Sequence, residues 1–341
     1  MNPRYLFSFL RIMKIPGMYP IMKDWEAFIR MHFIHAACES GLLDALATPR
    51  TRKDLIAKLD VNRPGLLDAL LEVGIATREL ALTDGLYRIR GKRSRAVTGP
   101  DGDMLAALIQ ANVTYYGGAY RNAADRIHGA ELGDDLARIG DLVARFSKIT
   151  EPVIRKFIAG IVGNGKPLRI FDIGCGSGVL LKAAFDANPQ VSGVGLDIDE
   201  AVVRQARNNL SAWGLAGRFN IIQGDVRNVP ENITGPFDVI TLYNLLYYFE
   251  ADERADLMRT LHGMLAPRGV VAVPMGFRGN GRDLGMANLN FVNSSLKGLT
   301  PLPEPHEVAS LLKRCGFGDI KIHKFMPGST YLGIIARKRD T

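Results

Sequence analysis

From residue 168 onward, short apolar runs alternate with stretches of helical periodicity, and this alternation constrains the fold more than any other feature. The apolar runs are LRIFDI, VSGVGLDI, FNIIQGD, FDVITLY and VVAVPM, separated by helical patterns such as DEAVVRQARNNLSAW and DERADLMRTLHGML. Strands joined through helices pair in parallel, with helices on both faces of the sheet. Two final runs, DIKIHKF and TYLGIIARK, are joined by MPGS and predict an antiparallel pair at the sheet edge. The predicted fold class is therefore α/β with an antiparallel last strand.

The first hundred of the 341 residues predict a separate, mostly helical domain. HFIHAACESGLLDAL suits one helix ending near a glycine, and TRKDLIAKLDV and RPGLLDALLEVGIA suit two more. ATRELALTDGLYRIRG alternates around Asp84-Gly85, a hairpin turn. Three helices and a hairpin predict a winged-helix-like domain over residues 1–100. Residues 101–163 then form a helical bridge to the sheet domain, residues 164–341.

The predicted winged helix and the net charge of +8 both raise the question of DNA binding. The basic residues are spread along the chain, with one tight cluster, RGKRSR. The helix that would read DNA, RPGLLDALLEVG, carries Asp68, Glu72 and only one arginine, Arg63. A helix that reads the major groove needs several Arg, Lys, Asn or Gln side chains on one face. We therefore expect no nucleic-acid partner, and a regulator that senses a ligand through its second domain is a remote alternative.

The N-terminal 25 residues mix apolar and basic side chains. Four basic residues interrupt the segment: Arg4, Arg11, Lys14 and Lys23. No signal-peptide core or membrane span is expected, whereas an amphipathic surface helix and a packing arm both fit. Three scattered cysteines, Cys38, Cys175 and Cys315, form no CxxC pair and lie near no histidine pair of metal-ligand spacing. This pattern predicts a cytoplasmic, reduced protein without a metal site.

The stretch FDIGCGSG follows the first predicted strand and contains Gly174, Gly176 and Gly178. Glycines in a turn between a strand and a helix let the backbone approach a ligand closely. The spacing is G-x-G-x-G, whereas the dinucleotide fingerprint is G-x-G-x-x-G. The glycines alone therefore leave the ligand undecided.

Three acids at the ends of three strands decide between the ligands. Asp172 precedes the glycines, Asp197 ends the second strand, and Asp225 ends the third. S-adenosylmethionine carries an amino group, a ribose diol and an adenine amine but no phosphate. Asp197 can accept both ribose hydroxyls, and Asp225 can accept from the adenine amine. Asp172 favours the positive methionine end, whereas it would repel a pyrophosphate.

Together these motifs resemble the class I S-adenosylmethionine-dependent methyltransferases, with D-x-G-x-G-x-G, an acid after the second strand and G-D after the third. The resemblance covers residues 168–338 and implies a Rossmann-like methyltransferase sheet with S-adenosylmethionine as cofactor. Cys175 is expected to be a small side chain in the turn. The implied cofactor-binding residues are Asp172, Gly174, Cys175, Gly176, Gly178, Asp197, Ile198, Gly224, Asp225, Val226 and Tyr243.

The domain order resembles the small-molecule O-methyltransferases, whose N-terminal domain forms a dimer and closes the acceptor pocket. The resemblance therefore implies a homodimer and a small-molecule substrate. Family members that methylate phenols carry a histidine general base after the fourth strand, in a stretch like L-H-D-W. The matching stretch here is NLLYYFEADE, and the place of the histidine falls on Tyr247.

The missing histidine leaves two explanations open. Another residue acts as base, with His32, His35, His128 and His262 as candidates, or the acceptor has no proton to lose. A thioether sulfur fits the second explanation, because it attacks the sulfonium methyl directly. We prefer S-methylation of a thioether acid such as 4-methylthio-2-hydroxybutyrate by base-free in-line displacement. In length, domain order and lack of the histidine base, the chain is similar to the methylthiohydroxybutyrate S-methyltransferases that make dimethylsulfoniopropionate. O-methylation of a small hydroxylated or phenolic metabolite is the alternative.

Aromatic faces suit the moving positive charge of such a reaction. The aromatic candidates are Tyr115, Tyr116 and Tyr120 on the bridge, and Tyr243, Tyr247, Tyr248 and Phe249 after the fourth strand. Arg278 and Arg282 follow the fifth strand and, with Asn244, could hold a substrate carboxylate. The expected catalytic residues are Tyr243, Asn244 and Tyr247. The expected substrate-binding residues are Tyr115, Tyr116, Tyr120, Asn244, Tyr247 and Arg278.

Overall fold

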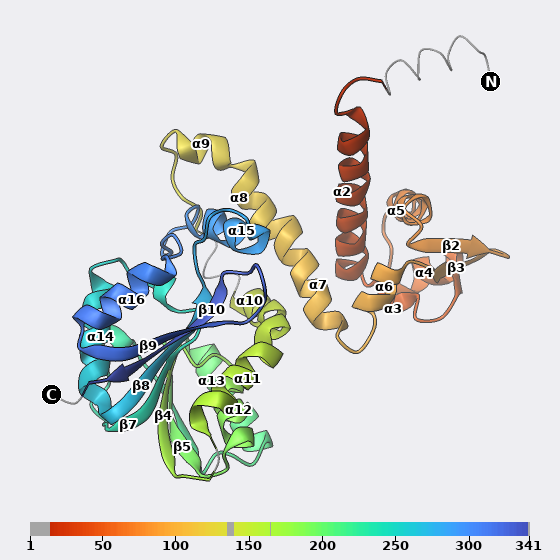
Figure 1. The fold of residues 1–341 in the computed structure, drawn as a ribbon. Coiled ribbons are helices and arrows are strands. Elements are labelled where there is room, and N and C mark those ends of the chain that lie inside the picture. The colour runs from red at the N-terminus through yellow and green to blue at the C-terminus, as the bar shows by residue number, and fades with distance from the viewer. Residues whose placement is uncertain (1–13, 135–139, 164, 340–341) are drawn as a thin grey trace. The chain divides into compact units, whose positions relative to one another are not determined.

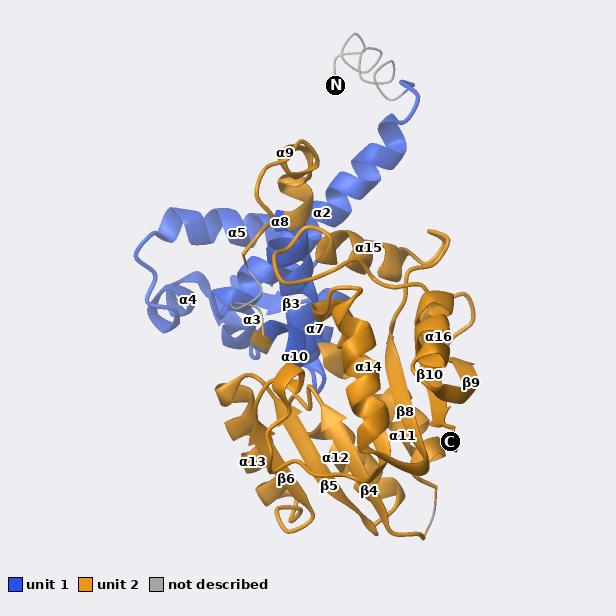
Figure 2. Ribbon diagram, turned by 90° about the vertical axis from the view of Figure 1, so that its left-hand side faces the viewer, with its two compact units in different colours: residues 1–118, 141–146 blue, residues 119–140, 147–341 orange. Residues whose placement is uncertain are grey.

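The computed structural model describes residues 14–134, 140–163 and 165–339. Arg4 and Arg11 lie outside the described residues. The chain divides into two compact units, residues 1–118 with 141–146 and residues 119–140 with 147–341 (Figure 2).

Unit 1 consists of helices and a small three-stranded antiparallel sheet. Its helices are α2 (Met18–Glu39), α3 (Leu42–Ala45), α4 (Arg52–Lys58), α5 (Pro64–Ala76), α6 (Lys92–Val97) and α7 (Gly102–Gln110), which continues into a π-helical turn, η1 (Ala111–Tyr116). Its strands β1 (Arg50–Thr51), β2 (Leu80–Thr83) and β3 (Leu86–Ile89) have the order β1-β3-β2. Leu82 pairs with Tyr87 in an antiparallel ladder across Asp84 and Gly85, so the predicted hairpin is confirmed.

The first helix begins earlier than the sequence predicted. The helix begins at Met18, so residues 18–25 of the expected N-terminal arm are helical. It ends at Glu39, near a glycine as predicted, because Gly41 adopts a left-handed φ of 70°, and the residues after this glycine form a separate short helix, α3. Phe33, Ile34 and Ala37 on the last turns of α2 are buried in the core of this unit.

Unit 2 is built on a seven-stranded sheet with the order β6-β5-β4-β7-β8-β10-β9 (Figure 1). The strands are β4 (Leu168–Ile173), β5 (Val191–Asp197), β6 (Phe219–Gln223), β7 (Phe237–Leu242), β8 (Leu265–Gly276), β9 (Phe317–Lys324) and β10 (Tyr331–Lys338). The first five are parallel, and β10 is antiparallel to both of its neighbours. The α/β fold with an antiparallel last strand is confirmed. β10 lies inside the sheet, however, and β9 forms the edge.

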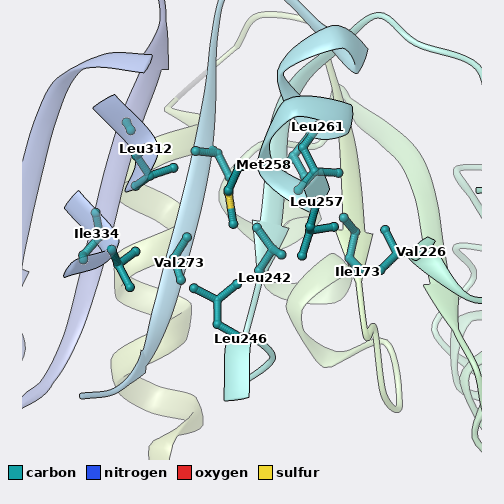
Figure 3. Close-up of a cluster of buried hydrophobic side chains, with 14 of the residues drawn as sticks. Ile173, Val226, Leu242, Leu246, Leu257, Met258, Leu261, Val273, Leu312 and Ile334 are labelled. Carbon is teal, nitrogen blue, oxygen red and sulfur yellow. The ribbon is translucent and has the colours of Figure 1, made fainter. Parts of the chain in front are cut away.

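Helices cover both faces of this sheet (Figure 1). The helices of unit 2 are α8 (Gly117–Arg121), whose first two residues belong to unit 1, α9 (Ala123–Ile127), α11 (Glu151–Val162), α12 (Val179–Ala187), α13 (Glu200–Ala212), α14 (Glu253–Met264), α15 (Leu284–Asn293) and α16 (Pro305–Arg314); α10 (Gly140–Ser147) is divided between the units, and η3 (Lys148–Thr150) precedes α11. One core contains buried side chains of α11, α12 and α13. The other contains those of α14 and α16, among them Leu257, Met258 and Leu312 against Leu242 and Val273 (Figure 3).

The connections between the strands bring the predicted motifs to the side of the sheet where the parallel strands end, which we call the carboxyl edge. The carboxyl ends of β4 to β8 lie at this edge, and β10 begins there because Tyr331 pairs with Gly276, the last residue of β8. Ligands of doubly wound sheets bind outside the carboxyl ends of the strands. In the described part of the chain, no helix combines the length and apolar character that a membrane span requires.

Candidate cofactor and acceptor site

The glycine loop connects β4 to α12 at the carboxyl edge. Gly174, Gly176 and Gly178 have φ values of 67°, 52° and 82°, a region that side chains other than glycine adopt at a cost. A Cβ on Gly174 would lie 2.9 Å from Leu245 Cδ1, whereas a Cβ on Gly176 would meet nothing within 4 Å. The loop therefore packs tightly at its start and faces open space at Gly176.

Cys175 is a packing residue of this loop. Its backbone N–H donates to Leu196 O at 3.0 Å, and its thiol is buried against β5, where a Cβ on Gly195 would lie 2.9 Å from Sγ. Burial, with the charges of Asp172 and Asp197, raises the pKa of the thiol far above its usual range. A protonated, buried thiol is a poor nucleophile, which agrees with the small-side-chain role expected for Cys175.

Asp197 at the end of β5 is held against the glycine loop by backbone donors. Its Oδ2 accepts from Gly176 N–H at 3.0 Å, and its Oδ1 accepts from Asp199 N–H at 3.1 Å. Burial raises the pKa of this carboxyl, while the two hydrogen bonds oppose the rise. The next side chain, Ile198, is 64% exposed and offers an apolar surface beside the acid. A fixed carboxylate next to an apolar face suits a ribose and its attached base.

Asp225 follows β6 on the neighbouring strand. Gly224 N–H donates to Asp197 O at 2.9 Å, so the second and third acids lie at adjoining strand ends. Asp225 Oδ1 accepts from Arg227 N–H at 2.9 Å, and its Oδ2 lies 3.3 Å from Arg227 Nη1. Val226, also expected at the cofactor site, has a buried side chain in the core.

Asp172 lies beneath the loop, and only 1% of the residue is exposed. Thr241 Oγ1 donates to its Oδ1 at 2.6 Å. Burial raises the pKa of Asp172 to about 7, and the charge of Asp197 adds to the rise, while the Thr241 hydrogen bond opposes it. Three acids around a loop that is open at Gly176 fit a cationic ligand without phosphate, as S-adenosylmethionine is.

Arg227 connects Asp225 to the segment after β7, a role that sequence reasoning missed. Its Nε donates to Glu253 Oε1 at 2.9 Å and its Nη2 to Tyr248 O at 3.0 Å, while its guanidinium lies 4.5 Å from the Phe249 ring centroid. The contact of Arg227 with Asp225 could have been suggested from the sequence, because the two residues are only two positions apart. No local pattern indicated the contact with Glu253, which is 26 residues away.

The segment after β7 holds the expected catalytic residues in different environments. Tyr243 shares a 2.6 Å hydrogen bond with Thr150 Oγ1. Asn244 has a left-handed φ of 49°, and its N–H donates to Pro274 O at 3.1 Å. Tyr247, which takes the place of the histidine, is 9% exposed and belongs to the core formed with α14 and α16. Burial raises the pKa of the neighbouring Tyr248, and the charge of Asp197 adds to the rise, so Tyr248 lies within electrostatic reach of Asp197.

The tyrosines expected on the bridge fall into both units. Tyr115 and Tyr116 lie in the π-helical turn of unit 1 with ring centroids 5.1 Å apart, and Tyr116 packs edge-on against Phe146. Tyr120 belongs to unit 2, where its hydroxyl donates to Asn288 Oδ1 at 2.8 Å and its ring stacks on Phe291.

The arginines expected to hold a carboxylate differ in their contacts. Arg278 Nη2 lies 2.9 Å from Glu304 Oε1 and 3.6 Å from Glu307 Oε1, so its charge is already paired. It lines a surface cavity of about 330 Å³ together with Arg254 and Arg314. Arg282 is exposed, and its backbone N–H donates to Asn280 Oδ1.

The four candidate histidines are divided between the units. His32 and His35 lie on α2 in unit 1, and His32 Nδ1 is 2.9 Å from Phe28 O. His128 is exposed at the end of α9. His262 on α14 packs edge-on against Phe317, with its Nε2 buried. His262 is thus half-buried, and its Nε2 has no hydrogen-bond partner within the described residues.

Comparison with known proteins agrees with this geometry. Residues 171–271 match the family described as a methyltransferase domain. The chain is 34% identical over 160 residues to a release factor glutamine methyltransferase from Rhodospirillum rubrum, which covers 40% of the chain and 47% of that protein. The chain spans less than half the length of the curated relatives it matches first.

Two solved structures share the fold along nearly the whole chain. Mitomycin 7-O-methyltransferase has a TM-score of 0.77 at 19% identity, covering 98% of this chain and 100% of its own. Human N-acetylserotonin methyltransferase, solved in complex with S-adenosylmethionine, has a TM-score of 0.74 at 19% identity, covering 96% and 99%. The acid-lined glycine loop lies within the matched segment. Residues 171–271 thus match a methyltransferase domain, and they belong to a Rossmann-like sheet whose fold is shared with these two methyltransferases.

Proposed function

We propose that the protein transfers a methyl group from S-adenosylmethionine to a small-molecule acceptor. The observation that carries the proposal is the glycine loop, open at Gly176 and surrounded by Asp172, Asp197 and Asp225. When bound, the cofactor supplies a methyl group on a cationic sulfur. Asp197 and Asp225 would hold its ribose and adenine, and Asp172 would favour its positive end.

The work of the protein is then to bring the acceptor atom in line with that methyl group and to exclude water. Positioning of this kind supplies a large part of the rate of group transfer between two bound molecules. Tyr243 and Asn244, directly after β7, are the chain's own candidates for the acceptor side. Neither carries a basic side chain, so a base-dependent reaction needs its proton acceptor elsewhere.

Two acceptor classes follow, each with its own support. The solved structures that share the fold include several named O-methyltransferases, which supports a small hydroxylated or phenolic metabolite. The position expected for a histidine base holds Tyr247, whose side chain is buried in the core. That observation supports an acceptor without a proton to lose, and we propose a thioether acid such as 4-methylthio-2-hydroxybutyrate as this second class.

Mass spectrometry of the purified full chain tests the proposal. The protein is incubated with S-adenosylmethionine and, in separate reactions, 4-methylthio-2-hydroxybutyrate, methionine, catechol and phenol. We expect S-adenosylhomocysteine and one methylated product. Transfer to the thioether acid supports base-free S-methylation, whereas transfer to catechol or phenol overturns it in favour of O-methylation. Calorimetry that detects no binding of S-adenosylmethionine or S-adenosylhomocysteine would overturn the methyltransferase proposal itself.

We further propose a homodimer formed through unit 1 and a cytoplasmic location. Four large apolar side chains on α2 are more than half exposed: Tyr19, Ile21, Trp25 and Phe28. An apolar surface of this kind is typical of a protein interface. Light scattering after size exclusion should give twice the chain mass of 37.4 kDa, and Trp25→Glu with Phe28→Glu should shift the protein to the monomer. A monomeric wild type would contradict the dimer.

A further inference from the structure

Arg227, in the short helical turn after β6, uses every nitrogen of its guanidinium. Its Nε donates to Glu253 Oε1 at 2.9 Å, and its Nη2 donates to Tyr248 O at 3.0 Å. Its Nη1 donates to Asp225 Oδ2 at 3.3 Å. The guanidinium also lies over the Phe249 ring, 4.5 Å from the centroid. One side chain thus joins the third acid of the cofactor half to the segment that leads into α14.

The partners of Arg227 on the α14 side are themselves fixed. Phe249 is buried and belongs to the core formed with α14 and α16. Glu253 lies in the first turn of α14, and its Oε2 accepts from Glu250 N–H at 2.7 Å. The fold therefore sets the place of the guanidinium.

Arg227 in turn holds both carboxylate oxygens of Asp225. The backbone N–H of Arg227 donates to Asp225 Oδ1 at 2.9 Å, and Nη1 donates to Oδ2. A carboxylate has about four acceptor positions, so positions remain for a ligand after both contacts are made. Because both oxygens are held, the directions of these remaining positions depend on Arg227.

The exposure of this network indicates a role in orientation rather than in stability. The side chains of Asp225, Arg227 and Glu253 are 32%, 41% and 39% exposed. Ion pairs with this exposure add little to the free energy of unfolding, because water screens the charges and the side chains lose rotamer freedom. A fixed acceptor, however, binds a donor on a ligand without first having to be ordered.

We propose that Arg227 is a positioning residue that makes the cofactor site selective for a base with an amino group. Adenine carries an amino group that can donate to the fixed Asp225 carboxylate. Hypoxanthine carries a carbonyl oxygen at the same ring atom, and the carboxylate repels that oxygen. The inference rests on the proposed methyltransferase function and on the assignment of Asp225 to adenine.

The charges of the network leave Asp225 able to accept from the base. Arg227 lies between two carboxylates, those of Asp225 and Glu253, so one negative charge exceeds the positive charge. The hydrogen bond to Glu253 raises the pKa of Arg227, and the charge of Asp225 adds to the rise. The same hydrogen bond lowers the pKa of Glu253. Arg227 and Glu253 therefore stay charged together at physiological pH.

Calorimetry on the full chain with S-adenosylhomocysteine and its hypoxanthine counterpart, S-inosylhomocysteine, tests the inference. The wild type should bind S-adenosylhomocysteine at least about 10-fold more tightly. Arg227→Met keeps the aliphatic stem over Phe249 but removes the donors, and it should reduce this ratio to less than about threefold. Arg259→Met removes an exposed arginine paired with Asp256 on α14 and should leave the ratio unchanged. Equal affinities in the wild type would overturn the inference alone, whereas failure to bind either compound would overturn the methyltransferase proposal with it.

Arg227→Lys separates orientation from charge. Lysine keeps the positive charge but lacks the planar fork that reaches three partners, so the ratio should again fall below about threefold. A wild-type ratio in this variant would assign the effect to charge and contradict the positioning role. Glu253→Gln leaves Arg227 and Asp225 in place, weakens the anchor and should also lower the ratio. Should the Arg227 variants fail to fold, an unchanged ratio in Glu253→Gln is enough to overturn the inference.

A double-mutant cycle tests whether Arg227 acts through Asp225. Asp225→Ala should by itself bring the ratio below about threefold, because the acceptor is lost. Adding Arg227→Met should then change the ratio less than about twofold, since residues that act as one unit are not additive. A larger change in the double variant would mean that Arg227 acts on the base independently of Asp225, and the positioning role would be wrong.

Discussion

The two halves of the carboxyl edge differ in how completely their polar groups are paired. On the cofactor half, Asp197 accepts from two backbone N–H groups, Asp225 accepts from a third and pairs with Arg227, and Asp172 accepts from Thr241. On the acceptor half, the Tyr331 hydroxyl and Asn244 Oδ1 are buried and make no hydrogen bond of regular length and angle, although the Tyr331 hydroxyl lies within reach of Tyr243, Thr150 and Asn244. The acids of the cofactor half are thus fixed by hydrogen bonds within the protein, whereas the two buried atoms of the acceptor half are not.

Asp197→Ala should have the largest effect on the cofactor half. It removes a carboxylate expected to accept two ribose hydroxyls and also the bond that holds Gly176 N–H. Hydrogen bonds to a charged group contribute about 1.5–3 kcal/mol each, so the Kd for S-adenosylmethionine should rise at least about 100-fold by calorimetry. Asp186→Ala, which removes a surface partner of Lys182, is the control. A Kd within twofold of the wild type would remove Asp197 from the ribose site.

Gly176→Ala tests whether the cofactor occupies the open space beside the glycine loop. The Cβ meets no protein atom but demands a left-handed conformation that costs about 1–2 kcal/mol. Gly214, after α13, is a matched control, because it has a φ of 71° and equally open surroundings. Both variants should lose similar unfolding free energy, measured by urea denaturation. Only Gly176→Ala should weaken cofactor binding, by about 10-fold, and equal affinities in both variants would mean that no ligand approaches the loop at Gly176.

The raised pKa of Asp172 makes cofactor binding depend on pH. Because the pKa is about 7, the carboxyl becomes ionised as the pH rises through neutrality. The positive end of the cofactor prefers the ionised form, so binding should release a proton below pH 7 and the Kd should fall by up to about 10-fold between pH 5.5 and 8. Calorimetry in buffers of different ionisation enthalpy measures the released proton. Asp172→Asn should abolish the dependence, and an unchanged pH profile in that variant would assign it to another group.

The same pKa shift has a consequence for the stability of the protein without ligand. A carboxyl whose folded-state pKa is raised stabilises the fold while both states are protonated, and this contribution is lost as the pH rises from the unfolded value of about 3.9 to about 7 in the folded protein. Asp172→Asn carries no titrating group and should be relatively more stable than the wild type above pH 7. Urea denaturation at pH 5 and pH 8 measures the difference.

Sequence patterns correctly placed the glycines and acids of the cofactor half at the strand ends, because these signals are local. The glycines and Asp172 lie within seven residues, and Asp197 and Asp225 follow directly from strands with clear apolar runs. The acceptor half depends on distant pairings. Tyr331 is 181 residues from Thr150 in the chain, and only the insertion of β10 beside β8 brings it to this edge. No local pattern marks either residue.

Tyr247→Phe should have the smallest effect and tests the one site position taken from a family pattern alone. The side chain of Tyr247 packs in the core with α14 and α16, whereas burial and the charge of Asp197 raise the pKa of the neighbouring Tyr248. Initial rates of S-adenosylhomocysteine formation should therefore change less than about twofold in Tyr247→Phe and more in Tyr248→Phe, because a removed hydroxyl matters only where it reaches the reacting groups. A 10-fold loss in Tyr247→Phe alone would mean that its hydroxyl acts on the acceptor. The acceptor half would then extend into a side chain that the fold places in the core.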